Sequence, residues 1–166
     1  MRTQMYRANK SDEDVEYILN NLRFEDEEEL KSLFGEDWKE QTCKRIMQTK
    51  FYVMLGKGKD DKTPICMGGI EQDEKDAQGI GCAWLLCTDE LQKHGLQILK
   101  ELKKEVEKAD ERFWLTYNVI YEKNYTAKKW LKWLGFKFDK PRPEGIEIPE
   151  GFEFFYRVRP VKGLGE

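Results

Sequence analysis

A short polar motif, directly after an apolar run, has the residue types and position to bind an anion. The apolar run covers residues 80–87, and the motif reads Gln92-Lys93-His94-Gly95-Leu96-Gln97. Apolar periodicity over residues 91–109 predicts a long helix here, and helix N-termini attract anions through their N–H groups and dipole. Lys93 and His94 would add positive charge. From six residues alone, an ordinary helix start with polar side chains in water is the simpler interpretation, and both interpretations remain open.

Four cysteines and one histidine restrict the metal and thiol chemistry of the chain. Cys43, Cys66, Cys82 and Cys87 include no Cys-x-x-Cys pair, and His94 is the only histidine. Zinc sites need several such ligands at characteristic spacings, so the sequence argues against one. No neighbour that would activate a thiol marks Cys82 or Cys87 as a nucleophile. We expect both to be small core residues with reduced thiols.

Composition predicts a single globular domain over residues 1–166. Charged residues make up 37% of the chain and aromatic residues 13%, and the net charge is -3. This length supports one hydrophobic core, and the mixed charges lack the basic footprint of a nucleic-acid-binding domain. No apolar run approaches the ~20 residues of a membrane span, and the first residues lack a signal-peptide pattern. We therefore expect a cytoplasmic protein with neither a membrane nor a nucleic-acid partner.

Periodicity and turn residues predict a mixed α/β order of elements. The expected order is strand 3–8, helices 11–22, 25–34 and 37–49, strands 51–55, 64–71 and 80–87, helix 91–109, strand 113–119, helix 124–134, and strands 136–138 and 152–158. No repeat or linker divides this order. A sheet with helices on both of its faces follows from the pattern.

Residues 124–138 combine the start of a helix with a clear stop signal. Four apolar residues recur at helical spacing and predict one buried face: Ala127, Trp130, Leu131 and Leu134. Gly135 is placed to end the helix in a left-handed conformation. A helix that ends in Leu-Gly-Phe after an Asn-x-x-Ala start resembles the C-terminal motif of the GNAT superfamily. These proteins are acetyl-CoA-dependent N-acetyltransferases.

The resemblance to GNAT proteins extends to the order of elements along the whole chain. It implies a single-domain α/β (α+β) fold with a mixed, mostly antiparallel central sheet and helices on both faces. The family binds acetyl-CoA or CoA beside the central strand, through a Gln/Arg-x-x-Gly-x-Gly/Ala motif. Gln92 and Gly95 match this motif, whereas Gln97 replaces its small last residue. The implied cofactor-binding residues are Cys87, Thr88, Gln92, Lys93, His94, Gly95, Leu96, Gln97 and Asn124.

The acid and base of the reaction are harder to place by resemblance. GNAT enzymes often use a tyrosine seven residues after the helix Asn, and here that position holds Leu131. Tyr125 is the candidate acid among the nearby tyrosines, and Glu71 is the candidate base. Glu71 is also explained more simply as a solvated turn residue. The acidic run 25–29 is expected to be a solvated helix start, although an acidic wall there would favour a cationic acceptor.

A narrower resemblance links the chain to phage-encoded GNAT-like proteins, among them internal virion proteins of podoviruses. It rests on three segments, at residues 5–23, 84–91 and 130–136. Two hypotheses follow. The first is an N-acyltransferase that uses acyl-CoA and an amine acceptor. The second is a non-catalytic protein that binds a partner in a phage particle or in the host.

Overall fold

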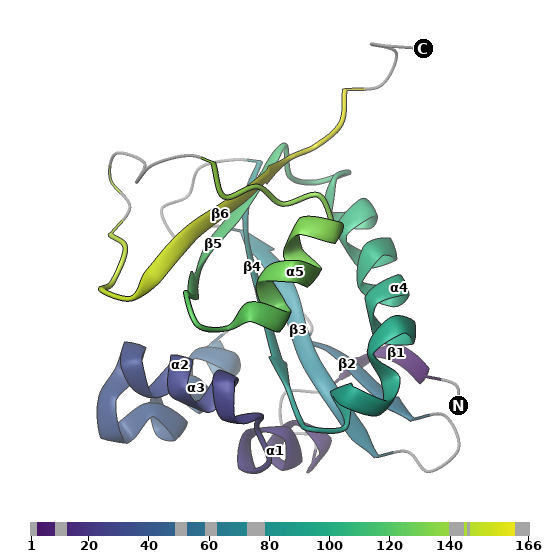
Figure 1. Ribbon diagram of the computed structural model, residues 1–166. Helices are drawn as coiled ribbons and strands as arrows, with labels where there is room; N and C mark the ends of the chain where they lie inside the picture. Colours follow the sequence, from purple (N-terminus) through teal and green to yellow (C-terminus); the bar gives the residue numbers. More distant parts are fainter. Residues whose placement is uncertain are drawn as a thin grey trace. The chain divides into compact units, whose positions relative to one another are not determined.

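A computed structural model describes residues 3–8, 13–48, 53–58, 63–72, 79–139, 145 and 147–161. Figure 1 shows its elements. The order along the chain is β1 (Thr3–Ala8), α1 (Glu13–Asn20), α2 (Phe24–Phe34), η1 (Gly35–Asp37), α3 (Trp38–Gln48), β2 (Val53–Gly58), β3 (Pro64–Gln72), β4 (Ile80–Cys87), α4 (Leu91–Ala109), β5 (Leu115–Tyr121), α5 (Tyr125–Trp133) and β6 (Phe152–Val158).

The chain divides into two compact units. The first unit comprises Met1–Gly69 and Trp84–Glu101, and the second comprises Ile70–Ala83 and Leu102–Glu166. Strands β3 and β4 and helix α4 therefore contribute residues to both units. The single domain expected over residues 1–166 stays a prediction.

The six described strands form one sheet and follow one another in chain order. Strands β1 and β2, β2 and β3, and β5 and β6 pair antiparallel, whereas β4 and β5 pair parallel. The prediction of a mixed, mostly antiparallel sheet is thereby confirmed. Parallel neighbours need a crossover connection between them, and here helix α4 makes the crossover from β4 to β5. The start of α4 therefore follows directly on the end of β4.

Four expected elements differ from the structure by two residues or more, and one of them is β5, which covers Leu115–Tyr121 and not residues 113–119. Helix α1 ends at Asn20, and Leu22 instead bridges Thr88. Strand β2 runs on to Gly58, which pairs with Thr3 across the antiparallel ladder. Residues 136–138 form only one bridge, in which Lys137 and Tyr156 exchange N–H···O bonds of 2.8 and 3.1 Å. In each case main-chain pairing with a distant segment determines the conformation, and this pairing cannot be predicted from the local pattern of side chains.

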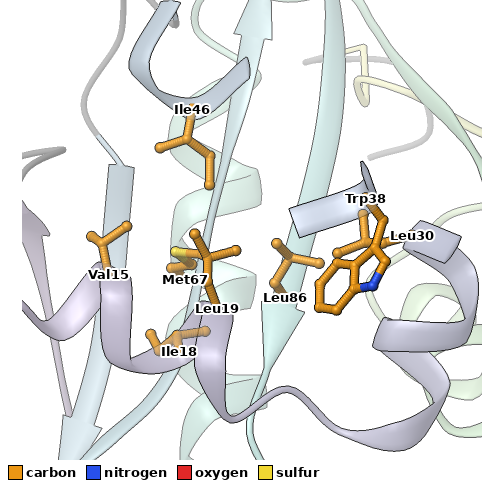
Figure 2. Close-up of a cluster of buried hydrophobic side chains, with 8 residues drawn as sticks. All are labelled: Val15, Ile18, Leu19, Leu30, Trp38, Ile46, Met67 and Leu86. Atoms are coloured by element: carbon orange, nitrogen blue, oxygen red, sulfur yellow. The ribbon is translucent and has the colours of Figure 1, made fainter. Parts of the chain in front are cut away.

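The core of the first unit packs three helices onto the inner strands. Its buried members are Val15, Ile18, Leu19, Leu30, Trp38, Ile46, Met67 and Leu86, drawn in Figure 2. Val15, Ile18 and Leu19 share one face of α1, as their spacing requires. Met67 lies on β3 and Leu86 on β4, so this cluster packs helices α1, α2 and α3 against β3 and the end of β4.

The core of the second unit joins α5 to the β5–β6 pair. Val106, Ile120, Phe136 and Phe155 are buried together, and Ala127, Leu131 and Leu134 pack against them. Gly135 has a φ of 95°, and the Phe136 N–H donates to the Leu131 carbonyl at 2.9 Å. This left-handed helix end confirms the stop predicted at Gly135. The left-handed turn at Gly135 directs Phe136 back towards α5, where it packs with Leu131 and Leu134.

Candidate functional site

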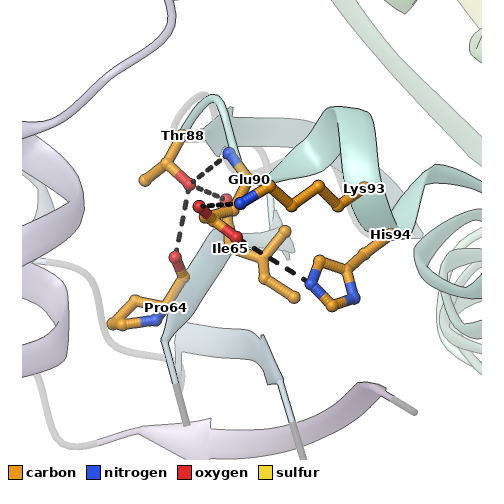
Figure 3. Close-up of polar contacts among 6 residues, drawn as sticks. All are labelled: Pro64, Ile65, Thr88, Glu90, Lys93 and His94. Carbon is orange, nitrogen blue, oxygen red and sulfur yellow. Dashed lines mark hydrogen bonds and ion pairs between the residues drawn. The ribbon is translucent and has the colours of Figure 1, made fainter. Parts of the chain in front are cut away.

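A buried threonine, Thr88, directly follows β4 and ties the end of that strand to β3 (Figure 3). The Thr88 N–H donates to the Ile65 carbonyl at 2.8 Å, and its Oγ1 lies 3.2 Å from the Pro64 carbonyl oxygen. The same Oγ1 accepts a bond of 3.3 Å from the Glu90 N–H. Thr88 therefore anchors the turn from which α4 starts, and the position of that helix end relative to β3 is fixed by main-chain contacts.

The N–H groups at the start of α4 are largely engaged by the preceding turn. Those of Leu91, Gln92 and Lys93 donate to the carbonyls of residues 88–90 at 3.1, 3.2 and 3.0 Å. Gly95 and Gln97 lie one turn further along, inside the helix. What this helix end presents to solvent is the positive end of its dipole and the exposed side chains of Gln92, Lys93, Leu96 and Gln97.

The carboxylate of Glu90 lies close to two side chains of this helix end. Glu90 Oε1 lies 3.2 Å from Lys93 Nζ, and Glu90 Oε2 lies 3.9 Å from His94 Nε2 (Figure 3). His94 is buried, with 3% of its surface exposed, and its Nδ1 makes no hydrogen bond in the described part of the chain. The bond to Glu90 offsets part of the charge that Lys93 could offer to an anion, whereas His94 is buried.

A buried ion pair clamps the end of β4 to the start of α2. Arg23 donates to the two carboxylate oxygens of Asp26 at 3.2 and 3.0 Å, and both residues are buried. Asp26 Oδ2 also accepts a bond of 2.8 Å from the Cys87 N–H, and the Arg23 N–H donates to the Cys87 carbonyl at 2.8 Å. Both main-chain polar groups of Cys87 are thus held, one by Arg23 just before α2 and the other by Asp26 in the first turn of α2.

Burial and hydrogen bonding act in opposite directions on this pair. Burial raises the pKa of the Asp26 carboxyl, and the hydrogen bonds from Arg23 and Cys87 act to lower it. Burial acts to lower the pKa of Arg23, but the carboxylate of Asp26 outweighs it and raises that pKa. Because the carboxylate accepts three hydrogen bonds, we treat the pair as ionised.

The Cys87 side chain has the properties of an unreactive thiol. A hydrogen bond to Cys66 and complete burial raise the pKa of Cys87 well above its usual value. A raised pKa lowers the thiolate fraction at neutral pH, and the thiolate is the reactive species. The structure thus places Cys87, predicted to contact the cofactor, with its thiol in the core and its main chain bonded to Arg23 and Asp26.

We expect iodoacetamide at pH 8 to alkylate Cys43 in the native protein and to leave Cys66 and Cys87 unmodified. Cys43 is exposed on α3, whereas Cys66 and Cys87 are buried. Peptide mass spectrometry before and after denaturation measures the difference, since unfolding makes all the thiols reactive. Alkylation of native Cys87 at the rate of Cys43 would contradict the burial and the raised pKa described above.

In the second unit, the parallel pairing of β4 with β5 is short. It runs from Ile80 opposite Leu115 to Cys82 opposite Tyr117. At the next position the Asn118 side-chain amide, and not a main-chain group, donates to the Ala83 carbonyl at 2.7 Å. The main-chain pairing of β4 with β5 thus ends at Cys82, and a side chain makes the contact to Ala83. Asn118 was not identified from the sequence, where it lies unmarked within a strand.

The other predicted site residues of the second unit have different surroundings. Asn124 precedes α5 and is buried, and its side chain does not cap the helix. Tyr125 is 67% exposed, and Glu71 is half-buried in β3, so Glu71 is a strand residue and not a turn residue. Leu131, at the position of the family's tyrosine, packs on the core of the unit. The roles assigned to Tyr125, Glu71 and Asn124 stay predictions.

The role of Asp26 was also not predicted from the sequence, because residues 25–29 were expected to be a solvated helix start. The other four residues of that run are half-buried, and only Asp26 is fully buried. A signal for this exists, because Asp26 lies four residues before the buried Leu30 and therefore on the same face of α2. A carboxylate on a buried helix face needs a cationic or N–H partner, and Arg23 lies one turn before it.

Two other classes of feature are not found in the described part of the chain. No group of three His, Cys, Asp or Glu side chains there is arranged to hold a metal ion. None of the described helices is both long and apolar enough to cross a membrane.

Comparison with known proteins identifies the fold. No protein-family profile matches the sequence, and no curated protein matches it. Among solved structures, the chain is similar to PH1933 from Pyrococcus horikoshii OT3, with a TM-score of 0.68 and 14% identity over 96% of this chain and 100% of that one. It is also similar to an acetyltransferase of the GNAT family from Streptococcus pneumoniae, with a TM-score of 0.63 and 16% identity over 95% and 100% of the two chains.

A third similar structure contains ligands. It is the spermidine N-acetyltransferase from Vibrio cholerae in complex with CoA and spermine, with a TM-score of 0.64 and 12% identity over 95% of both chains. At these identities the similarity establishes the fold and no more. The chain has the GNAT fold over nearly its whole length, as its element order predicted.

Proposed function

We propose that this protein is an acyl-CoA-dependent N-acyltransferase that acts on an amine. The observation that carries the proposal is the similarity, over at least 95% of the chain, to structures of N-acetyltransferases. Two local features support it. The pairing of β4 with β5 ends after three residue pairs, and the start of α4 presents Gln92 and Lys93 to solvent.

The residues at the start of α4 are chemically suited to the diphosphate of CoA. The helix dipole favours an anion there, the first turn of α4 contains no acidic residue, and Lys93 can neutralise a phosphate once it leaves Glu90. Gly95 is half-buried and has no side chain to crowd a ligand. The side chain of Gln97 is exposed to solvent, so it can turn away from a ligand bound at this helix end.

The proposed reaction transfers an acyl group from sulfur to nitrogen. The amine nitrogen attacks the thioester carbonyl, a C–N bond forms, the C–S bond breaks, and the sulfur takes a proton from the acid and leaves as the CoA thiol. One N–H proton must pass to a base, for which we propose Glu71, while Tyr125 is the proposed acid. With Leu131 at the position of the usual tyrosine, much of the rate enhancement must come from holding the amine against the thioester.

Release of CoA thiol from acetyl-CoA in the presence of a panel of amines tests this proposal. We expect thiol release above the rate without amine, and its loss in Gly95→Glu, whose carboxylate would repel the diphosphate. Glu90→Gln should lower KM for acetyl-CoA by up to about 5-fold, because it frees Lys93 from a pair worth roughly 0.2–1 kcal/mol. Glu40→Gln on α3, which removes the same charge and breaks the exposed pair with Lys44, is the matched control. No amine-dependent release from the folded protein would reject the proposal.

A second candidate function is a non-catalytic role in binding a protein, for example in a phage particle or its host. The observation that favours it is that polar groups a cofactor could contact already make hydrogen bonds within the protein. The first-turn N–H groups of α4 bond to residues 88–90, and Cys87 bonds to Arg23 and Asp26. A stable complex with a phage or host protein, together with no response to acetyl-CoA, would favour this role.

A further inference from the structure

One face of the β5–β6 pair is almost entirely aromatic. The antiparallel register places Tyr117 opposite Tyr156, Val119 opposite Phe154 and Tyr121 opposite Phe152. Residues two apart in a strand share a face, so these six side chains lie on one side of the sheet, and we call them the aromatic face. The rings of Tyr121 and Phe152 have centroids 5.7 Å apart, and the ring of Phe154 lies 5.9 Å from both Tyr117 and Tyr156.

The opposite face of the same strands holds the core and the cations. Ile120 and Phe155 are buried there with Val106 and Phe136. Arg157 is ion-paired with Asp110 on that side, and Glu153 is paired with Lys128. Lysine and arginine number 29 in the chain, yet none of the six residues of the aromatic face is basic.

The aromatic face is electron-rich and partly open to solvent. Phe152 and Phe154 are buried at its base, whereas Tyr117, Tyr121 and Tyr156 are half-buried. The Tyr156 hydroxyl donates a bond of 2.5 Å to Asp139 Oδ1, which sets a carboxylate at the edge of the face. The faces of aromatic rings carry partial negative charge and attract cations.

We propose that the aromatic face binds the ammonium group of a cationic acceptor, so that the substrates are amines with a second positive charge. This inference rests on the proposed N-acyltransferase function. Tyr117 pairs with Cys82 at the last paired position of β4 and β5, next to the Asn118 amide. A diamine held here by one ammonium group can present its other, uncharged amine for acylation.

Titration of the full chain, labelled with ¹³C in its tyrosine rings, tests the inference directly. The probes are 1,8-diaminooctane and 1,8-octanediol, which match in length and differ in charge. We expect the ring signals of Tyr117, Tyr121 and Tyr156 to shift with the diamine, and the diol to require at least about 5-fold higher concentration for the same shift. No shift with the diamine, or an equal shift with the diol, in the folded protein would overturn the inference.

Two variants separate the ring from the hydroxyl. Tyr121→Leu should weaken diamine binding by about 2- to 5-fold, whereas Tyr121→Phe should keep it, because the cation contacts the ring. Tyr17→Leu, at an exposed tyrosine of α1, is the control. A parallel titration with acetyl-CoA tests the proposed function independently. A response to acetyl-CoA without one to the diamine would overturn the inference and leave the proposed function standing.

Discussion

Asp26→Ala is expected to lower the free energy of unfolding by about 3–5 kcal/mol, measured by urea denaturation. The substitution removes the carboxylate that neutralises Arg23, and a buried guanidinium without its partner is costly. It also removes the acceptor of the Cys87 N–H, which donates to Asp26 at 2.8 Å. The loss should therefore be felt at the end of β4, although Asp26 lies 61 residues away in the sequence.

Two comparisons isolate the buried charge. Glu27→Ala on the same helix should cost less than about 1 kcal/mol, because Glu27 is 37% exposed and lies 3.8 Å from Lys31. The double variant Arg23→Met/Asp26→Leu should be more stable than Asp26→Ala, because no uncompensated charge remains buried. A loss below 1 kcal/mol in Asp26→Ala would show that the pair is not buried as described.

Ile18→Ala is expected to destabilise the protein by about 2–5 kcal/mol, through lost burial and the cavity it leaves. Ile18 is fully buried and packs with Met67 and Leu86 in the core that holds α1 against the sheet. Because the helices of the first unit share this core, its weakening should also loosen the clamp on β4. Chemical denaturation measures the first effect, and hydrogen exchange at the Cys87 N–H measures the second.

Tyr17→Ala is the matched control for this core variant. Tyr17 is the preceding residue of α1 and is 42% exposed, so its truncation should change stability by less than about 0.5 kcal/mol. Equal losses for the two variants would contradict the account of core packing, because alanine is a better helix former than either residue and burial is then the main difference between the two positions.

The sequence predicted best those elements whose signals are local. The helix at Leu91–Ala109 and the strands at Thr3–Ala8 and Phe152–Val158 have the predicted bounds, because apolar periodicity and turn residues delimit each of them. The helix end at Gly135 was also predicted, since only glycine enters the left-handed region at little cost. These successes together made the GNAT fold recognisable from the order of elements.

Features that depend on distant contacts could not be predicted in this way. The extension of β2 to Gly58 follows from pairing with β1, and the clamp on Cys87 follows from the approach of α2 to β4. The start of α4 was placed correctly, but the bonding of its first N–H groups to residues 88–90 depends on turn geometry. The sequence was therefore enough to locate this helix, but not to predict which of its N–H groups are already hydrogen-bonded.

The proposed function requires an acyl-CoA site, and isothermal titration of acetyl-CoA into the purified chain measures binding at that site. We expect saturable heat for the wild-type protein, a weaker response for Gln92→Ala, and none for Gly95→Glu. Circular dichroism of each variant verifies that it is folded. An absence of heat from the folded wild-type protein, or unchanged binding in Gly95→Glu, would rule out this site and favour the role in binding a protein.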